Sequence, residues 1–170
     1  MALTRNMEDA LNEHINQEFY ASYLYLSMSA YCESINLPGF AHWMRIQSQE
    51  EYAHALKLFD FVNDRDGRVN LHPIRQPDIE FQSPLDLMQQ TLEHERGVSH
   101  LINGLYQVAI KEEDYATQVH LQWFITEQVE EEKTVSDLVE QLKLIGNQGD
   151  ALLLLDRELA KRTVAGATPA

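Results

Sequence analysis

Four stretches of this chain repeat apolar side chains at alternating steps of three and four residues, and polar side chains interrupt each repeat near its middle. This spacing keeps side chains on one face of a helix, so we expect each stretch to bury that face in a core. The polar positions on the four faces are, in chain order, Glu18, then Glu51 and His54, then Glu95, then Gln128 and Glu131. Because an isolated ionised carboxyl is costly to bury, these glutamates must be paired, protonated or bound to a cation.

The composition suits a single helical domain. The chain has 170 residues of which 44% are hydrophobic, enough for one buried core, and its one cysteine, Cys32, excludes an intrachain disulfide and a cysteine-based zinc site. A net charge of −14 argues against nucleic acid as a partner and is compatible with attracting cations. Residues 1–12 lack the apolar run of a secretory signal, and no stretch approaches the roughly 20 apolar residues that cross a bilayer. We therefore expect a cytoplasmic protein with no membrane partner.

Capping residues and helix breakers set the expected helix limits. Pro38 suits the first position of a helix, Ser83 and Pro84 together indicate an N-cap and a first position, Asp114 can cap, and Gly146 ends a helix. The expected helices cover 4–32, 38–65, 84–111, 115–144 and a short segment at 150–161. The prediction is one domain over 1–162 followed by a frayed tail over 163–170.

The lengths of the connections predict the topology. The breaks after the first and third helices span only a few residues, so each must join antiparallel neighbours. A helix of about 28 residues is about 42 Å long, whereas the linker over 66–83 can extend to about 60 Å and can therefore cross the whole bundle. The second and third helices then run parallel, in an up, down, down, up bundle with one long crossover.

The polar positions share a height as well as a face. Each lies about 11 to 17 residues from the start of its helix, so all of them meet near the middle of the bundle. An oxygen-rich site with one imidazole and no sulfur suits Fe(II), Mn(II) or Zn(II), and a bridging carboxylate could hold two ions. A redox-active pair could pass two electrons to dioxygen or peroxide, whereas zinc could act only as a Lewis acid or through bound hydroxide. The ligand types alone leave these choices open.

Three strings of the sequence resemble the bacterial non-haem ferritins: NQEFY at 16–20, QEEYAH at 49–54 and QWFITEQVEEEK at 122–133. The resemblance spans nearly the whole chain and includes the short fifth helix. It implies an all-α, ferritin-like four-helix bundle and a homo-oligomeric cage of about 24 subunits that stores and detoxifies iron. Each subunit would oxidise Fe(II) with dioxygen or hydrogen peroxide at a di-iron ferroxidase centre, and Fe(III) would be deposited as a mineral inside.

The same resemblance implies roles for individual residues. Glu18, Glu51 and His54 would bind the first iron, and Glu51 as a bridge would bind the second together with Glu95 and Glu131. Gln128 would be a neighbour or weak ligand. A third, outlying iron position would be formed by Glu50, Glu127, Glu130 and Glu131. Tyr25, which lies two helical turns after Glu18 on the same face, would be an electron donor beside the centre.

Departures from relatives narrow the function. Haem-containing bacterioferritins carry a second Glu-x-x-His motif, whereas this chain has Gln128 and Glu131 at that spacing, and Tyr52 stands where they place a methionine haem ligand. We therefore expect no haem. The alternative functions are a non-storage di-iron carboxylate oxidase, which would need a substrate pocket, and a structural bundle whose carboxylates coincide by chance.

Other polar and apolar positions receive simpler interpretations. Six further histidines are expected at the surface or at interfaces: His14, His42, His72, His94, His100 and His120. Glu113 and Asp114, at a helix junction, could line an iron entry channel by analogy with the family. The leucines at 152–155 and Leu159 would expose an apolar patch on the fifth helix, which predicts burial against other subunits.

Overall fold

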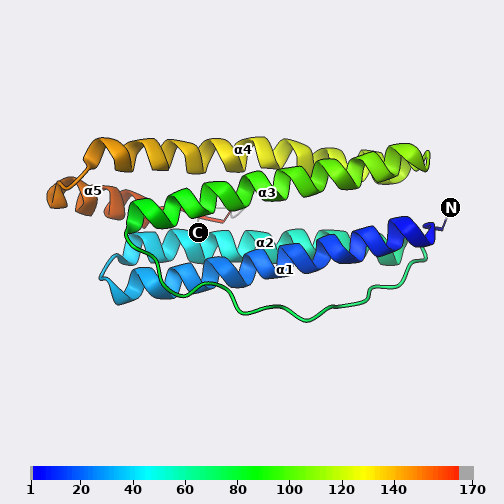
Figure 1. Ribbon diagram of the computed structural model, residues 1–170, viewed down its shortest axis with the longest axis horizontal. Helices are drawn as coiled ribbons and strands as arrows, with labels where there is room; N and C mark the ends of the chain where they lie inside the picture. The colour runs from blue at the N-terminus through cyan, green and yellow to red at the C-terminus, as the bar shows by residue number, and fades with distance from the viewer. Residues whose placement is uncertain (1, 165–170) are drawn as a thin grey trace.

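The structure, a computed structural model, describes residues 2–164, and every regular element in that part of the chain is a helix (Figure 1). The elements are α1 (Arg5–Ser34), α2 (Pro38–Asp64), α3 (Pro84–Lys111), α4 (Tyr115–Ile145) and α5 (Gly149–Leu159). The predicted all-α class is confirmed, and each predicted boundary lies within two residues of the observed one. Most of the predicted tail falls at 165–170, outside the described residues, while Thr163 and Val164 form no regular element.

The predicted topology is also confirmed. Helices α1 and α2 pack as one antiparallel pair, α3 and α4 pack as a second, and α1 contacts α3 across the two pairs. The segment 65–83 runs along the length of the bundle beside α1, so α2 and α3 point the same way (Figure 1). α5 packs mainly against α2, at the end of the bundle where α2 begins and α4 ends (Figure 1).

Local chemistry explains where the helices begin and end. The side chains of Thr4, Ser83 and Asp114 accept hydrogen bonds from backbone N–H groups three residues later, as N-caps do. α4 ends at Gly146, whose φ of 55° is a left-handed conformation that glycine adopts at little cost. The capping roles predicted for Ser83, Asp114 and Gly146 are therefore confirmed.

The core consists of two apolar clusters separated by a polar layer. One cluster lies toward α5 and includes Phe40, Leu87 and Val135, and the other lies at the opposite end and includes Leu58 and Ile102. Every long helix contributes to both clusters, and the segment of each helix between them carries the polar residues singled out in the sequence. Two apolar cores thus hold the polar layer from either end.

α5 is seated on the first turn of α2 by a close backbone approach. A Cβ atom at Gly39 would lie 1.7 Å from the carbonyl oxygen of Asp156, so only glycine permits this contact. The Asp156 side chain accepts a hydrogen bond of 2.9 Å from the backbone N–H of Phe40. The position of α5, and of the residues that follow it, is therefore defined relative to α2.

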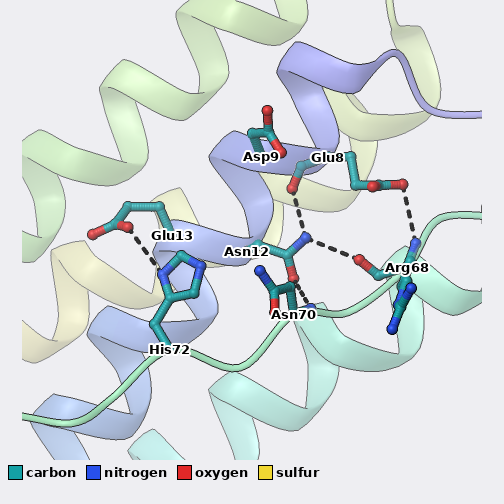
Figure 2. Close-up of a pocket in the computed structure, with 7 residues that line it drawn as sticks. All are labelled: Glu8, Asp9, Asn12, Glu13, Arg68, Asn70 and His72. Carbon is teal, nitrogen blue, oxygen red and sulfur yellow. Dashed lines mark hydrogen bonds and ion pairs between the residues drawn. The ribbon is translucent and has the colours of Figure 1, made fainter.

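The beginning of the crossover is tied to α1 by a buried asparagine, Asn12 (Figure 2). Its Nδ2 donates to the carbonyl oxygens of Glu8 and Arg68 at 3.1 and 3.0 Å, and its Oδ1 accepts from the N–H of Asn70 at 2.7 Å. The Glu8 carboxylate accepts a further bond of 3.0 Å from the N–H of Arg68.

Within residues 2–164, no helix is long and apolar enough to span a bilayer.

The substitution Asn12→Ala should release the start of the crossover. Because it leaves the carbonyl of Arg68 and the N–H of Asn70 without this partner, we expect a loss of about 1–3 kcal/mol in the free energy of unfolding. Thermal unfolding would measure the loss, and faster hydrogen exchange at the Asn70 amide would locate it. Asn70→Ala is the matched control, because it removes an exposed side chain and keeps that N–H donor; equal destabilisation by both variants would contradict the role of Asn12.

Candidate metal centre

All four long helices contribute side chains to the polar layer. The six residues that the sequence singled out are each 6% exposed or less, and Gln47 joins them fully buried. α1 contributes Glu18; α2 contributes Gln47, Glu51 and His54; α3 contributes Glu95; α4 contributes Gln128 and Glu131. The structure therefore brings together the polar faces of all four helices.

The α1–α2 pair forms the more compact half of the centre. Glu18, Glu51 and His54 each offer a ligand atom, and these atoms lie within 4.8 Å of one another. His54 Nδ1 lies 3.2 Å from Glu51 Oε2, while the imidazole ring stands edge-on to the rings of Trp123 and Phe124. Two carboxylates and a sterically confined imidazole are a donor set that suits a divalent iron, manganese or zinc ion.

The α3–α4 pair forms a second half that side-chain amides connect to the first. Gln128 Nε2 donates to Glu95 Oε2 at 3.1 Å and to the Glu95 carbonyl at 3.2 Å. Gln47 Nε2 on α2 donates to Glu131 Oε2 at 2.8 Å and to Glu51 Oε1 at 3.3 Å. Glu95 and Glu131 are therefore held facing Glu51 by neutral donors rather than by positive charges.

Burial and mutual repulsion keep several of these carboxyls from ionising together. Burial, reinforced by the charges of Glu95 and Glu18, raises the pKa of Glu51 well above its usual range. Burial and the charge of Glu131 raise the pKa of Glu95 to about 8, and burial raises the pKa of Glu131 to about 7. A bound cation would remove this penalty. The donor set fits a metal ion for a further reason, because Glu18 Oε2 and Gln47 Oε1 are buried without a hydrogen-bond partner among the described residues.

Tyr25 reaches the centre from α1. It is completely buried, and its hydroxyl donates a hydrogen bond to Glu95 Oε1. Burial, together with the charges of Glu95 and Glu51, raises the pKa of Tyr25 well above its usual range, so the phenol stays protonated. The ring of His94 lies edge-on to the ring of Tyr25 at 5.6 Å between centroids. The family resemblance implied a place for Tyr25 beside the centre, where its hydroxyl contacts Glu95; its role as an electron donor stays a prediction.

One expected surface residue is part of the buried layer. His14 is 4% exposed, and its Nε2 lies 3.0 Å from Glu18 Oε1, although the direction of this contact does not satisfy hydrogen-bond geometry. Burial alone would raise the pKa of Glu18, but His14, together with His54 and Glu51, outweighs it and holds the pKa below its ordinary value. The surface assignment of His14 was therefore wrong. Its spacing of four residues before Glu18 was the available signal, because residues so spaced share a helix face.

The residues implied for a third iron do not gather in the same way. Glu50 forms an ion pair with Arg162, Glu127 is partly buried and Glu130 is exposed, while Glu131 faces the main centre. At the helix junction named as an entry channel, Asp114 is engaged as the cap of α4 and lies 3.1 Å from Arg65.

Known proteins match the chain over almost its full length. Residues 8–145 match the ferritin-like domain of the Ferritin family. A bacterial non-heme ferritin of Staphylococcus epidermidis is 38% identical over 161 residues, covering 95% of this chain and 97% of that protein. A bacterial non-heme ferritin of Campylobacter jejuni is 39% identical over 155 residues, covering 91% of this chain and 93% of that protein. A solved structure described as a novel open pore ferritin from the hyperthermophilic archaeon Archaeoglobus fulgidus has a TM-score of 0.95 and 49% identity, covering 95% of this chain and 100% of that chain.

The raised pKa of Glu95 predicts how the stability of the metal-free protein depends on pH. The pKa of Glu95 is about 8 in the folded protein, against an ordinary value of 4.5. The stability that its proton contributes is therefore fully present below pH 4.5 and is lost as the pH rises to 8. Glu95→Gln removes this titration. We expect its stability relative to the unaltered protein to rise by roughly 2–5 kcal/mol across that window.

Thermal unfolding of metal-free protein at several pH values would measure this change. Glu93→Gln, on the exposed side of the same helix, is the matched control, because it makes the same substitution outside the buried layer. A pH-independent difference for Glu95→Gln would contradict the assignment.

Proposed function

This chain belongs to the ferritin family, and from that premise we propose that it stores iron, oxidising Fe(II) at the buried centre and keeping the Fe(III) as a mineral within a shell of its own copies. The observation that carries the proposal is the layer of buried carboxylates between two apolar clusters. Such a layer destabilises a metal-free bundle and favours the binding of divalent cations. Its place inside one subunit, rather than at an open pocket, suits metal ions as the substrate.

Each half of the centre takes one Fe(II) in this proposal. Glu18 and His54 bind the first ion, Glu95 and Glu131 bind the second, and Glu51 bridges the two. Gln128 acts as a neighbour that orients Glu95, in accord with its hydrogen bond of 3.1 Å to that carboxylate. The raised pKa values of the second-half carboxyls mean that binding Fe(II) also displaces protons from them.

Oxidation of two Fe(II) ions supplies the two electrons that reduce one molecule of oxidant. Each Fe(II) loses one electron, and the pair of electrons with two protons reduces dioxygen to hydrogen peroxide, or reduces one hydrogen peroxide to two waters. When only one Fe(II) is bound, Tyr25 would supply the second electron of the pair, and its phenolic proton would pass to Glu95 once that carboxyl has lost its own proton. The Fe(III) ions then leave the centre for the mineral, so that the centre turns over.

Exposed apolar residues support the proposed assembly. On and before α5, Leu144, Leu153 and Leu154 are 85%, 51% and 62% exposed. A second patch joins α1 to the crossover and contains Tyr23, Leu26, Ile74 and Ile79. Two separate patches allow each copy to contact several others, as a closed shell of about 24 copies requires.

Aerobic addition of Fe(II) followed by sedimentation tests the storage function. We expect a very large particle that gains far more iron than its ligands could hold, because the mineral grows beyond the centre. A non-storage di-iron oxidase would oxidise Fe(II) but retain only stoichiometric iron, and a structural bundle would do neither. Either of these outcomes would overturn the storage proposal.

Glu51→Ala tests the bridging role. Because Glu51 would contact both ions, we expect the fast phase of Fe(II) oxidation to fall by more than the roughly 10- to 100-fold typical of a lost outer-shell partner, while assembly is preserved. Stopped-flow absorbance would follow the rate, and sedimentation would follow the assembly. The control is Asp60→Ala on the exposed face of α2, which should oxidise at the unaltered rate. Unaltered rates in Glu51→Ala would exclude the bridge.

A further inference from the structure

Arg162, three residues beyond the end of α5, folds back onto α2 and is largely buried there. Its guanidinium lies over the ring of Trp43, 4.2 Å from the centroid, and donates to the Trp43 carbonyl at 3.4 Å. Its own carbonyl oxygen lies 2.8 Å from His42 Nε2, and its side chain is only 19% exposed. Three contacts to two adjacent residues of α2 hold this charge in a defined place.

The guanidinium of Arg162 is directed at the carboxylate of Glu50. The two form an ion pair in which the Glu50 side chain is 13% exposed, and Glu50 is the immediate neighbour of Glu51. The pKa of Glu131 depends on the same group of charges. Burial raises its pKa, Gln47 and Arg162 oppose the rise, and Glu50 and Glu127 add to it. Glu50 and the Arg162 guanidinium are therefore in contact beside the main centre, near enough to Glu131 to influence its charge.

We propose that Arg162 is a tethered cation occupying the place between Glu50 and Glu131 where an outlying metal ion would bind, so that such an ion binds only by displacing it. The inference rests on the proposed function, since it concerns iron that enters or leaves the same centre. An arginine remains charged at any working pH, and two cations cannot share one carboxylate site without repulsion. Binding of a metal ion at the outlying position therefore depends on the conformation of Arg162.

The competition links the outlying position to α5. Arg162 follows α5 directly, with its N–H donating to the Leu159 carbonyl at 3.2 Å, and the seat of α5 on α2 is fixed by the contact of Gly39 with Asp156. By reciprocity, an ion that displaces Arg162 must loosen the end of α5 as much as Arg162 weakens the binding of that ion. The two inner positions would then fill first, and the outlying ion would bind only once its affinity exceeds that of the internal charge.

Zn(II) calorimetry on the assembled, full-length protein tests the competition without any oxidation. We expect two tight ions per subunit in the unaltered protein. In Arg162→Gln a third ion should bind about 5- to 150-fold more tightly than it does in the unaltered protein, the range typical of coupled sites. Arg162→Lys keeps a cation and should restore the unaltered titration. Lys161→Gln removes the same charge from an exposed neighbour paired with Glu158 and should leave the titration unchanged.

The double variant Arg162→Gln with Glu50→Gln locates the third ion. It should lose that ion again, because Glu50 would be one of its ligands. An unchanged third affinity in Arg162→Gln, a third ion retained in the double variant, or the same gain in Lys161→Gln would each overturn the inference. Fewer than two ions in the unaltered protein would instead contradict the di-iron centre itself.

Two further measurements apply if Arg162→Gln does not assemble. Arg162→Met keeps a long apolar stem over Trp43 while removing the charge, and it should show the same tighter third ion. In the unaltered protein, hydrogen exchange at residues 160–164 should accelerate as excess Zn(II) fills the outlying position. Binding of a third ion with unchanged exchange there would mean that Arg162 only fastens the end of α5.

Discussion

The rest of the structure depends on the burial of four carboxyl groups in one layer of a helical core. Neither apolar cluster could hold such a layer at low energy by itself, because burial and repulsion together raise the pKa of Glu51, Glu95 and Glu131. The layer is held by neutral partners: the amides of Gln47 and Gln128 and the hydroxyl of Tyr25. These donors hold the carboxyl groups in position without supplying positive charge, so a cation can take the place of the protons that the raised pKa values keep on them.

The bundle assembles this layer from two halves. The α1–α2 pair carries Glu18, Glu51 and His54, and the α3–α4 pair carries the carboxylates of the second half. The long crossover allows the two pairs to face each other with α2 parallel to α3. Within the centre, two hydrogen bonds then cross between the pairs, from Gln47 to Glu131 and from Tyr25 to Glu95. Each pair alone would expose its polar residues, so the centre exists only when the pairs meet.

Glu50, at the edge of the layer, has a positive partner, and there the partner is a side chain of the protein itself. Glu50 lies next to Glu51, yet its partner is a guanidinium carried by the segment after α5. The protein therefore places one of its own cations beside the buried centre. α5 then has two tasks, since its exposed Leu153 and Leu154 are available for contacts between subunits while its end sets the position of Arg162.

The sequence by itself determined the helices, their caps and the shared height of the polar residues, because helical periodicity, Ser83 and Asp114 as caps, and distance along a helix are local properties. The length of the crossover also determined the topology. Only the tertiary structure decided that His14 is buried against Glu18, that Gln47 reaches Glu131 across 84 residues and that Arg162 reaches Glu50 across 112. These contacts depend on how close the helices pack and how their faces are rotated. Spacing along one helix does not contain that information.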